Sequence, residues 1–403
     1  MSKNNNDFFK AKKEWSCVKD ELLGCYLKPY FQKLLATKKD IIYIDCFAGK
    51  GIFEDGSKGS PIIALEIIKD CLSNSHQNGV KIEPYFIELN HSDELKQNLI
   101  SYGLSDNNIV SGSYEDKVFE ILSGRNDINV FLYIDPYGIK SLDYNFFNKL
   151  SCCKLINSIE ILINFNSFGF VREACHAMGG KFDDYNIFQD LLEYEGTRLE
   201  RNSKSEELLN RIAGGDYWKN TINKFKRKEI TGKEAEVTFS KDFCIKLQLC
   251  FRYVLNMPLR IRQDHHPKYR MIHLTKHVEG CLIMADNIIK RWQLMINIQS
   301  GNQISFFKED TENNIISGMT ITEEVKNHIM QFDNFTRLNQ ILADFYMKNG
   351  VKYSTSDLKK ELRNLEECRL IQVKRVPDTT PTGKQTKFYE EKGTKKVLIR
   401  WKL

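Results

Sequence analysis

The chain has 403 residues, of which 41% are hydrophobic and 28% charged, enough for one large domain and at least one smaller one. It has no run of about 18 apolar residues and no apolar segment near the first methionine, which argues against a membrane span and a signal peptide. We therefore expect a cytoplasmic protein. The 11 cysteines are odd in number and include no Cys-x-x-Cys pair, so we expect reduced thiols and no metal site.

The formal net charge is +6, and the positive excess lies near the C-terminus. Residues 351–403 hold 14 Lys and Arg against 7 Asp and Glu, so the rest of the chain is close to neutral. A local positive excess favours a polyanionic partner, although charged surfaces are also often only solvated.

Five short apolar runs alternate with helical patterns in the first part of the chain. A helix from Glu14, interrupted at Pro29, precedes the first run, and a helix that begins at Ser60 follows it. Strands that alternate with helices predict a parallel sheet covered on both faces. The predicted strands are Ile41–Asp45, Tyr85–Glu88, Asn108–Val110, Val130–Ile134 and Ile159–Ile163.

Two further strands are expected later in the chain. Apolar residues from Phe243 to Val254 have helical spacing, and the segments Leu259–Arg262 and Met271–Thr275 then predict a strand pair. This pair completes a doubly wound, mostly parallel seven-stranded sheet with a terminal antiparallel hairpin. The fold class is therefore α/β.

The last segment predicts two helices, Leu338–Met347 and Thr355–Glu367, followed by a hairpin with a basic loop, Pro377–Lys387. This order is typical of a winged helix, a variant of the helix-turn-helix that binds nucleic acid or serves as a protein-contact module. Lys384 and Lys387 are the candidates for contacts with a nucleic-acid backbone. The expected parts of the chain are a helical lead-in (1–40), the large α/β domain (41–296) with a polar insertion (180–235), a linker (297–333) and the basic domain (334–403).

A glycine loop follows the first strand. Gly49 and Gly51 allow the backbone to approach a ligand, and Asp45 can accept hydrogen bonds from an ammonium group or from loop amides. A dinucleotide fingerprint requires a third glycine where Glu54 stands, and a Walker loop requires Ser or Thr where Gly51 stands. Glu88, at the end of the second strand, can hold a ribose diol. A nucleoside with a cationic centre and no phosphate fits these acids best, and S-adenosylmethionine has that description.

The loop resembles that of class I methyltransferases that act on amino groups of nucleic acids, which read Asp-x-Phe-Ala-Gly-x-Gly. The resemblance implies that S-adenosylmethionine is the cofactor, with Phe47 against its methionine part and Ser113 near its adenine. Many relatives have Asp where this chain has Ser113. The implied cofactor residues are Asp45, Phe47, Ala48, Gly49, Gly51, Glu88 and Ser113.

The fourth strand ends in Asp135-Pro136-Tyr137-Gly138. This motif is similar to the Asp/Asn-Pro-Pro-Tyr of amino methyltransferases and to the Asp-Pro-Phe/Tyr-Gly of tRNA guanine-N2 enzymes. Asp135 and the Pro136 carbonyl can accept the hydrogens of an exocyclic amine, while Tyr137 stacks on the base. Asn164, at the end of the fifth strand, is a further candidate contact to the base, and Arg172 a candidate for phosphate. All four motif residues also favour simple turns.

The motifs together, over roughly residues 14–290, resemble the three-Cys-motif partner proteins (TcmP). The linked segments are Phe47–Gly51, Gly59–Pro61, Phe86–Glu88 and Asp135–Gly138. The resemblance implies a class I methyltransferase-like fold and a genetic partner with a three-cysteine, radical-SAM-like motif. We therefore expect a methyltransferase acting on an amino group of a base in RNA or DNA. The alternatives are a non-catalytic nucleic-acid-binding adaptor of the same fold and, less strongly supported, a protein methyltransferase.

Overall fold

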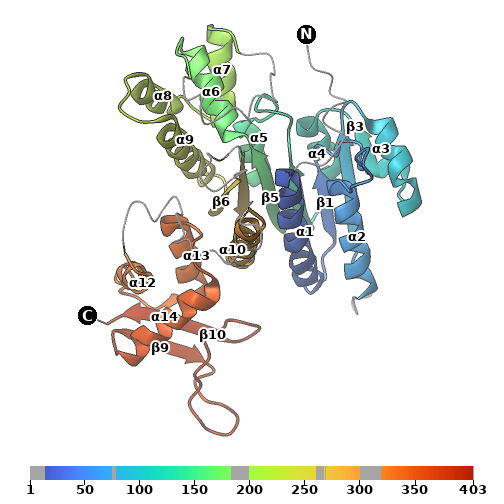
Figure 1. The fold of residues 1–403 in the computed structure, drawn as a ribbon. Coiled ribbons are helices and arrows are strands. Elements are labelled where there is room, and N and C mark those ends of the chain that lie inside the picture. Colours follow the sequence, from blue (N-terminus) through green and yellow to red (C-terminus); the bar gives the residue numbers. More distant parts are fainter. Residues whose placement is uncertain are drawn as a thin grey trace. The chain divides into compact units, whose positions relative to one another are not determined.

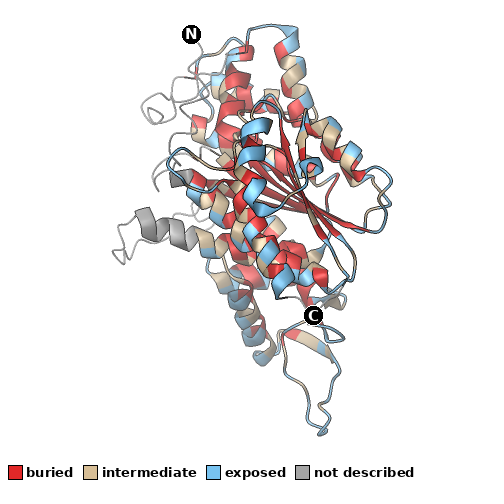
Figure 2. Cartoon of the chain, turned by 90° about the vertical axis from the view of Figure 1, so that its right-hand side faces the viewer, coloured by how far each residue is buried: buried red, intermediate tan, exposed pale blue. Residues whose placement is uncertain are grey.

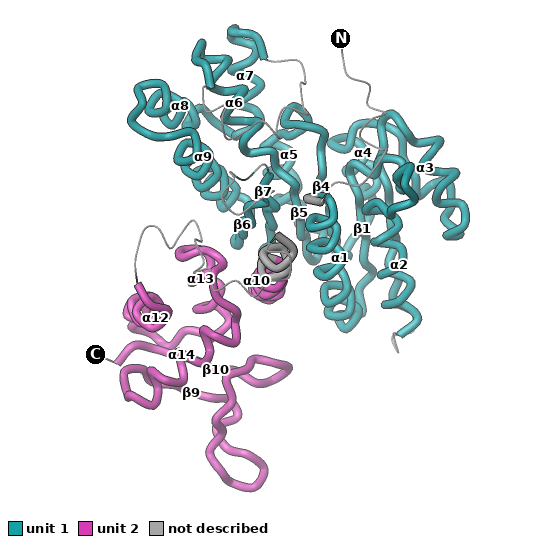
Figure 3. Tube along the Cα trace, in the orientation of Figure 1, with its two compact units in different colours: residues 1–276 teal, residues 277–403 magenta. Residues whose placement is uncertain are grey.

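The computed structural model describes residues 14–74, 79–182, 199–259, 267, 269–299 and 319–402. They form two compact units, residues 1–276 and residues 277–403 (Figure 3). Parts of the predicted insertion and linker, residues 183–198 and 300–318, lie outside the described ranges. Within those ranges, no helix combines the length and the apolar character that a membrane crossing requires.

The first unit is built on a seven-stranded sheet of order β3-β2-β1-β4-β5-β7-β6 (Figure 1). The first five strands in this order run parallel, and β7 runs antiparallel to both β5 and β6. The predicted doubly wound α/β fold of methyltransferase type is thus confirmed. The strands are β1 (Ile41–Asp45), β2 (Ile82–Glu88), β3 (Ile109–Ser111), β4 (Asn129–Ile134), β5 (Ser158–Phe165), β6 (Tyr253–Leu259) and β7 (Tyr269–Thr275).

Helices connect and cover these strands. The α-helices of the first unit are α1 (Glu14–Leu35), α2 (Ser60–Ser73), α3 (Ser92–Leu99), α4 (Tyr114–Leu122), α5 (Tyr144–Ser151), α6 (Ser167–Ala177), α7 (Ser203–Ala213), α8 (Trp218–Lys226) and α9 (Gly232–Leu247). Part of the predicted polar insertion therefore consists of α7, α8 and the start of α9.

The central strands β1, β4 and β5 are buried along their whole length, as expected for parallel strands covered on both faces (Figure 2). On one face, Tyr26 and Tyr30 of α1 lie 5.9 and 5.1 Å from the ring of Phe131 on β4, measured between ring centroids. Tyr43 of β1 stacks on the same ring at 6.0 Å. This aromatic layer fixes α1 against the sheet, with the start of the helix toward the carboxyl ends of the strands.

Helix α1 does not end at Pro29, as we expected, but continues to Leu35. A proline inside a helix costs about 3 kcal/mol. The neighbouring side chains Tyr26, Leu27, Tyr30 and Phe31 are at most 3% exposed, and burial of one such side chain contributes about 1.5–3 kcal/mol. Tertiary packing therefore outweighs the local cost of Pro29.

The prediction between Phe243 and Arg262 was wrong in its boundaries. Helix α9 ends at Leu247, and β6 begins at Tyr253, so Val254 lies in a strand. Residues 255–259 alternate between buried and partly exposed positions, the period of a strand with one covered face. The residues 260–262 of the predicted strand lie outside the described ranges.

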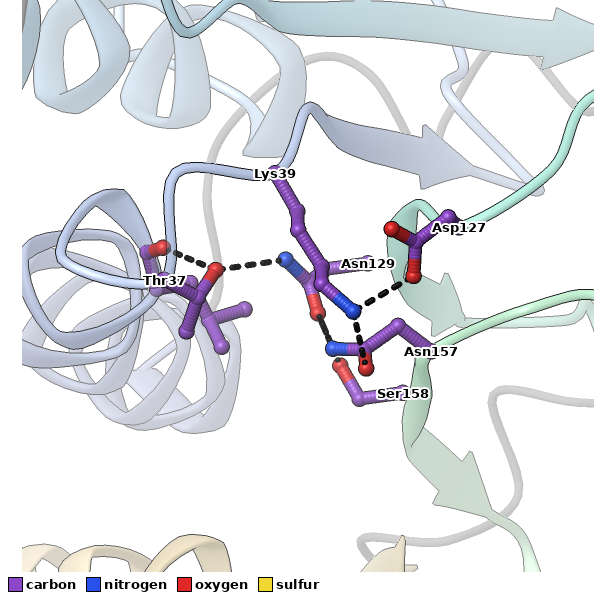
Figure 4. A network of polar contacts seen from close by, with 7 residues as sticks. Thr37, Lys39, Asp127, Asn129, Asn157 and Ser158 are labelled. Carbon is purple, nitrogen blue, oxygen red and sulfur yellow. Dashed lines mark hydrogen bonds and ion pairs between the residues drawn. The ribbon is translucent and has the colours of Figure 1, made fainter.

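The amino ends of the central strands are joined by polar side chains (Figure 4). Asn129 Oδ1 accepts hydrogen bonds from Asn157 Nδ2 and Ser158 Oγ, each at 2.7 Å. Lys39 Nζ donates to Asn157 Oδ1 at 2.8 Å and to Asp127 Oδ1 at 2.5 Å. These contacts tie β1, β4 and β5 together at the edge of the sheet opposite the strand ends at Asp45 and Asp135.

The second unit contains a three-stranded antiparallel sheet of order β8-β10-β9 with helices packed on it. The order along the chain from α12 is helix, strand, helix, helix and hairpin, so the predicted winged helix is confirmed. The elements are α10 (Val278–Gln299), α12 (Ile321–Ile329), β8 (Thr336–Arg337), α13 (Leu338–Asn349), α14 (Thr355–Glu367), β9 (Ile371–Val376) and β10 (Lys396–Trp401).

Two segments of the second unit differ from the expected division of the chain. Helix α10, expected in the α/β domain, packs against α13 and α14. Helix α12 lies in the range predicted as a linker, where Thr320 and Glu323 form a capping box and Val325 and Ile329 are buried. Because most residues of α12 are polar, its short apolar stripe is difficult to recognise in the sequence.

Candidate active site

A cleft opens at the carboxyl ends of β1, β4 and β5, where α/β sheets commonly bind ligands. Its walls come from the start of α1, the loop after β1, the start of α2, the turn after β4, the end of β5 and the start of β7. The lining residues are Ser16, Lys19, Asp20, Phe47, Ala48, Gly49, Lys50, Gly51, Ile52, Phe53, Gly59, Ser60, Asp135, Pro136, Tyr137, Gly138, Asn164 and Tyr269.

The glycine loop is folded back on the start of α2. Gly49 and Gly51 have φ angles of 59° and 77°, which favour glycine. The Gly59 amide donates to the Gly51 carbonyl at 2.8 Å. A Cβ on Gly59 would lie 2.9 Å from that carbonyl oxygen, so a side chain there would push the loop away. The sequence motifs around Gly51 and Gly59 thus form one structural unit.

Asp45 lies beneath this loop and is fully buried. Its Oδ1 accepts from the Phe47 amide at 3.2 Å, and its Oδ2 accepts from Ser60 Oγ at 2.6 Å. Burial raises the pKa of Asp45 to about 7, although both hydrogen bonds act in the opposite direction. Asp45 is not among the lining residues, so the structure shows it as an acceptor for a loop amide that holds the cleft wall in place.

Glu88 also supports the loop. Its Oε2 accepts from the Gly49 amide at 2.8 Å, and its Oε1 accepts from the amides of Asn90 and His91 at 2.9 and 3.2 Å. Like Asp45, Glu88 is not among the lining residues. The hydrogen bond from Gly49 joins the end of β2 to the loop after β1, and the other two hold the turn that follows β2.

Ser113 is not among the residues that line the cleft. It precedes α4, is exposed, and donates to Glu115 Oε2 at 2.5 Å. The nearby Tyr114 ring lies 5.1 Å from that of Phe47, centroid to centroid. Phe47 therefore links the loop that lines the cleft to the start of α4.

Asp135 is the centre of a polar cluster on the opposite wall. Lys19 Nζ lies 2.5 Å from its Oδ2, and Asn164 Nδ2 donates to its Oδ1 at 2.7 Å. Tyr133 Oη is a weaker donor to Oδ2, at 3.4 Å. The side chains of Lys19 and Asp135 are 7% and 23% exposed. The structure thus brings together Asp135 and Asn164, which we predicted to contact the amine and the base, and adds Lys19.

Lys19 was not among the predicted site residues, although its spacing gives a signal. It lies four residues after Trp15 and seven before Tyr26, so it shares the apolar face of the first helix. A lysine on a buried face requires a partner, and the acid at the end of a neighbouring strand is the partner observed. Its Nζ also lies 5.9 Å from the ring centroid of Tyr269.

Asn164 carries an unsatisfied polar atom. The residue is 2% exposed, and no residue in the described part of the chain donates to its Oδ1. Because the ion-paired carboxylate of Asp135 only accepts, the Asn164 amide must turn its Nδ2 toward Asp135. A buried acceptor of this kind commonly marks a position completed by a ligand or a water.

Arg172, Lys384 and Lys387, predicted as nucleic-acid contacts, do not line the cleft. The Arg172 side chain on α6 has its Nη2 3.2 Å from Glu173 Oε1. Lys384 and Lys387 are exposed in the loop between β9 and β10, in the second unit. Pro136 and Tyr137 line the cleft, and Gly138 has a φ of 77° that closes the turn after β4.

The fold and the cleft define an α/β protein with a mixed seven-stranded sheet of order 3-2-1-4-5-7-6, which is of methyltransferase type. No protein-family model and no curated protein matches the chain.

Proposed function

We propose that this protein is an S-adenosylmethionine-dependent methyltransferase that acts on an amino group of a base in RNA or DNA. The observation that carries the proposal is one cleft lined by the Phe47–Gly51 loop, Asp135-Pro136-Tyr137-Gly138 and Asn164. Three strand ends that are far apart in the sequence contribute to it, each with a residue type suited to this reaction.

The cofactor fits the loop side of this cleft. Phe47 and Ala48 offer apolar contact, while Gly49, Gly51 and Ser60 offer backbone and hydroxyl groups to a polar ligand. Asp45 and Glu88 hold the loop from behind through the Phe47 and Gly49 amides. S-adenosylmethionine supplies a methyl group on a positively charged sulfur, which keeps the electrons of the broken bond when an amine lone pair takes the methyl group.

The residues on the other wall act on the amine. Acceptors that hold the amine hydrogens aim its lone pair, and a stacked ring fixes the plane of the base. The Pro136 carbonyl and Asn164 Oδ1 are suitable acceptors, and Tyr137 provides the ring. Asp135, already paired with Lys19, orients Asn164. After methylation, the nitrogen releases its extra proton to solvent.

The second unit supports a nucleic-acid substrate. It has the winged-helix order and contains the C-terminal residues with 14 basic against 7 acidic side chains, a charge excess that attracts phosphates. The resemblance of the cleft motifs to TcmP proteins further leads us to propose a three-cysteine, radical-SAM-like protein as a partner.

Isothermal titration calorimetry with S-adenosylmethionine tests the cofactor proposal. We expect binding to the wild type and to Asp135→Ala, and loss of binding in Glu88→Ala, since Glu88 accepts from the Gly49 amide of the loop and from the Asn90 and His91 amides that follow β2. Absence of binding to the folded wild type would refute the proposal.

One observation favours the alternative of a non-catalytic adaptor. Both oxygens of Asp135 already have donors within 2.7 Å, from Lys19 and Asn164, so Asp135 is less available to a substrate than the motif implies. Cofactor binding without methyl transfer to any RNA or DNA, together with a stable complex with the three-cysteine partner, would support the adaptor.

A further inference from the structure

The positive charge of the second unit is concentrated in the hairpin and not in helix α14. Residues 371–402 hold 9 Lys and Arg against 3 Asp and Glu, whereas α14 holds 3 against 4. In a helix-turn-helix that reads duplex DNA, the helix in the position of α14 enters the major groove between two phosphate backbones. A helix without excess positive charge is poorly suited to that position.

The pairing of β9 with β10 separates the hairpin into two faces. Val397 and Ile399 are fully buried on the inner face, where Arg375 of β9 also forms an ion pair with Glu366 of α14. On the outer face, Lys374 is exposed and Val376 is 48% exposed.

The register extends this outer face across the sheet. Lys374 pairs with Leu398, Gln372 with Arg400, and Val376 with Lys396. Arg337 of β8 pairs with Leu398 from the other side. The outer sheet face, as we name it, therefore consists of Phe335, Arg337, Gln372, Lys374, Lys396 and Arg400, with Val376 and Leu398.

An aromatic ring lies among these cations. Lys374 Nζ is 4.1 Å and Arg400 Cζ is 4.6 Å from the ring centroid of Phe335. Arg337 is balanced by Glu391 at 3.0 Å, but within the described part of the chain no carboxylate pairs with Lys374, Lys396 or Arg400. The face thus combines unbalanced positive charge with a partly exposed ring.

We propose that the outer sheet face binds a single-stranded segment of nucleic acid. Cations that follow a backbone, together with aromatic and guanidinium planes on which bases stack, are the features by which proteins bind single strands. A flat strand surface presents them to unpaired bases, whereas duplex recognition relies on a helix in a groove. This inference deepens the proposed function, because it names the form of the nucleic acid and the surface that holds it.

The test measures binding by the full-length protein, without S-adenosylmethionine, so it is independent of methyl transfer. The probes are a labelled single-stranded RNA of about 15 nucleotides and the duplex of the same sequence, followed by fluorescence anisotropy. Lys374→Glu/Arg400→Glu alters the face. The control variant is Lys359→Glu/Lys360→Glu on α14, which makes the same change of charge outside the outer sheet face. Circular dichroism verifies that each variant is folded.

We expect the wild type to bind the single strand more tightly than the duplex. The face variant should lose at least about tenfold in affinity for the single strand. If two phosphate contacts are lost, the slope of the logarithm of the binding constant against the logarithm of the salt concentration should become shallower by about 1.4. The α14 variant should bind like the wild type. Phe335→Ala, which keeps every charge, should weaken single-strand binding about tenfold through lost stacking and affect the duplex less.

Equal or larger loss in the α14 variant would overturn the proposal in favour of helix-mediated binding. Tighter binding of the duplex, or no binding of either probe, would overturn it as well. In the last case, the face would fit an acidic protein instead.

Discussion

Lys19 on α1 and Asp135 at the end of β4 form an ion pair of 2.5 Å at the cleft, although 116 residues separate them in the sequence. Breaking a largely buried pair leaves one charge without a partner, which typically costs 3–5 kcal/mol. Since the Asp135 side chain is 23% exposed, we expect Lys19→Met to lower the free energy of unfolding by about 3 kcal/mol. Urea unfolding measures this.

Lys28→Met provides the matched control, because Lys28 on the same helix pairs with Asp70 in an exposed position. It should leave the urea midpoint unchanged, since exposed pairs contribute little. Equal urea midpoints for the two variants would show that the Lys19–Asp135 pair does not stabilise the folded protein.

Asn164→Leu removes both the donor to Asp135 and the unsatisfied Oδ1 with a side chain of similar volume. If that oxygen accepts the hydrogen of a substrate amine, methyl transfer should fall by at least about a hundredfold while S-adenosylmethionine affinity is kept. Normal turnover by this variant would show that Asn164 has no part in methyl transfer. Calorimetry and a labelled-methyl assay separate the two effects.

Asp45 makes stability depend on pH. Burial raises its pKa from 3.8 to about 7 in the folded protein, so between these values the folded state holds a proton that the unfolded state has released. Stability therefore falls as the pH rises from about 4 to 7, by on the order of 4 kcal/mol, and is flat above the folded pKa. Asp45→Asn, which can still accept from Phe47 and bond to Ser60, should remove this slope. An unchanged slope would assign the pH dependence to other groups.

The loop lysines of the hairpin give a prediction about ionic strength. If Lys384 and Lys387 each contact a phosphate, Lys384→Ala/Lys387→Ala should reduce the log–log salt slope of single-strand binding by about 1.4. Binding should weaken to a similar extent for all base sequences, because phosphate contacts carry no base information. A change in sequence preference without a change in slope would contradict the assignment. Anisotropy titrations at several salt concentrations measure both.

The sheet could be predicted because its central strands carry unambiguous signals. Ile41–Asp45 and Val130–Ile134 are continuous apolar runs that end in polar turns, and the structure has β1 and β4 at these positions, β4 from Asn129. Predictions failed where tertiary packing overrides a local rule, as at Pro29, or where two periods overlap, as between Leu247 and Val254.

The site was predictable in location but less so in detail. Motif spacing indicated which strand ends meet, since parallel strands bring their carboxyl ends to one edge. The sequence allowed Asp45 to accept from an ammonium group or from loop amides, and the amide of Phe47 is the donor observed. The sequence did not indicate that Glu88 accepts from the Gly49 amide, or that Lys19 pairs with Asp135, because these contacts depend on side-chain directions across elements distant in sequence.

The most direct test of the proposed activity is transfer of a labelled methyl group from S-adenosylmethionine to mixed RNA and DNA by the full-length protein. We predict label in the nucleic acid with the wild type, on an exocyclic amine after digestion to nucleosides, and none with a folded Asp135→Ala variant that still binds the cofactor. Label that appears equally with both proteins, or no label with a wild type shown to bind S-adenosylmethionine, would contradict a methyltransferase centred on Asp135 and Asn164.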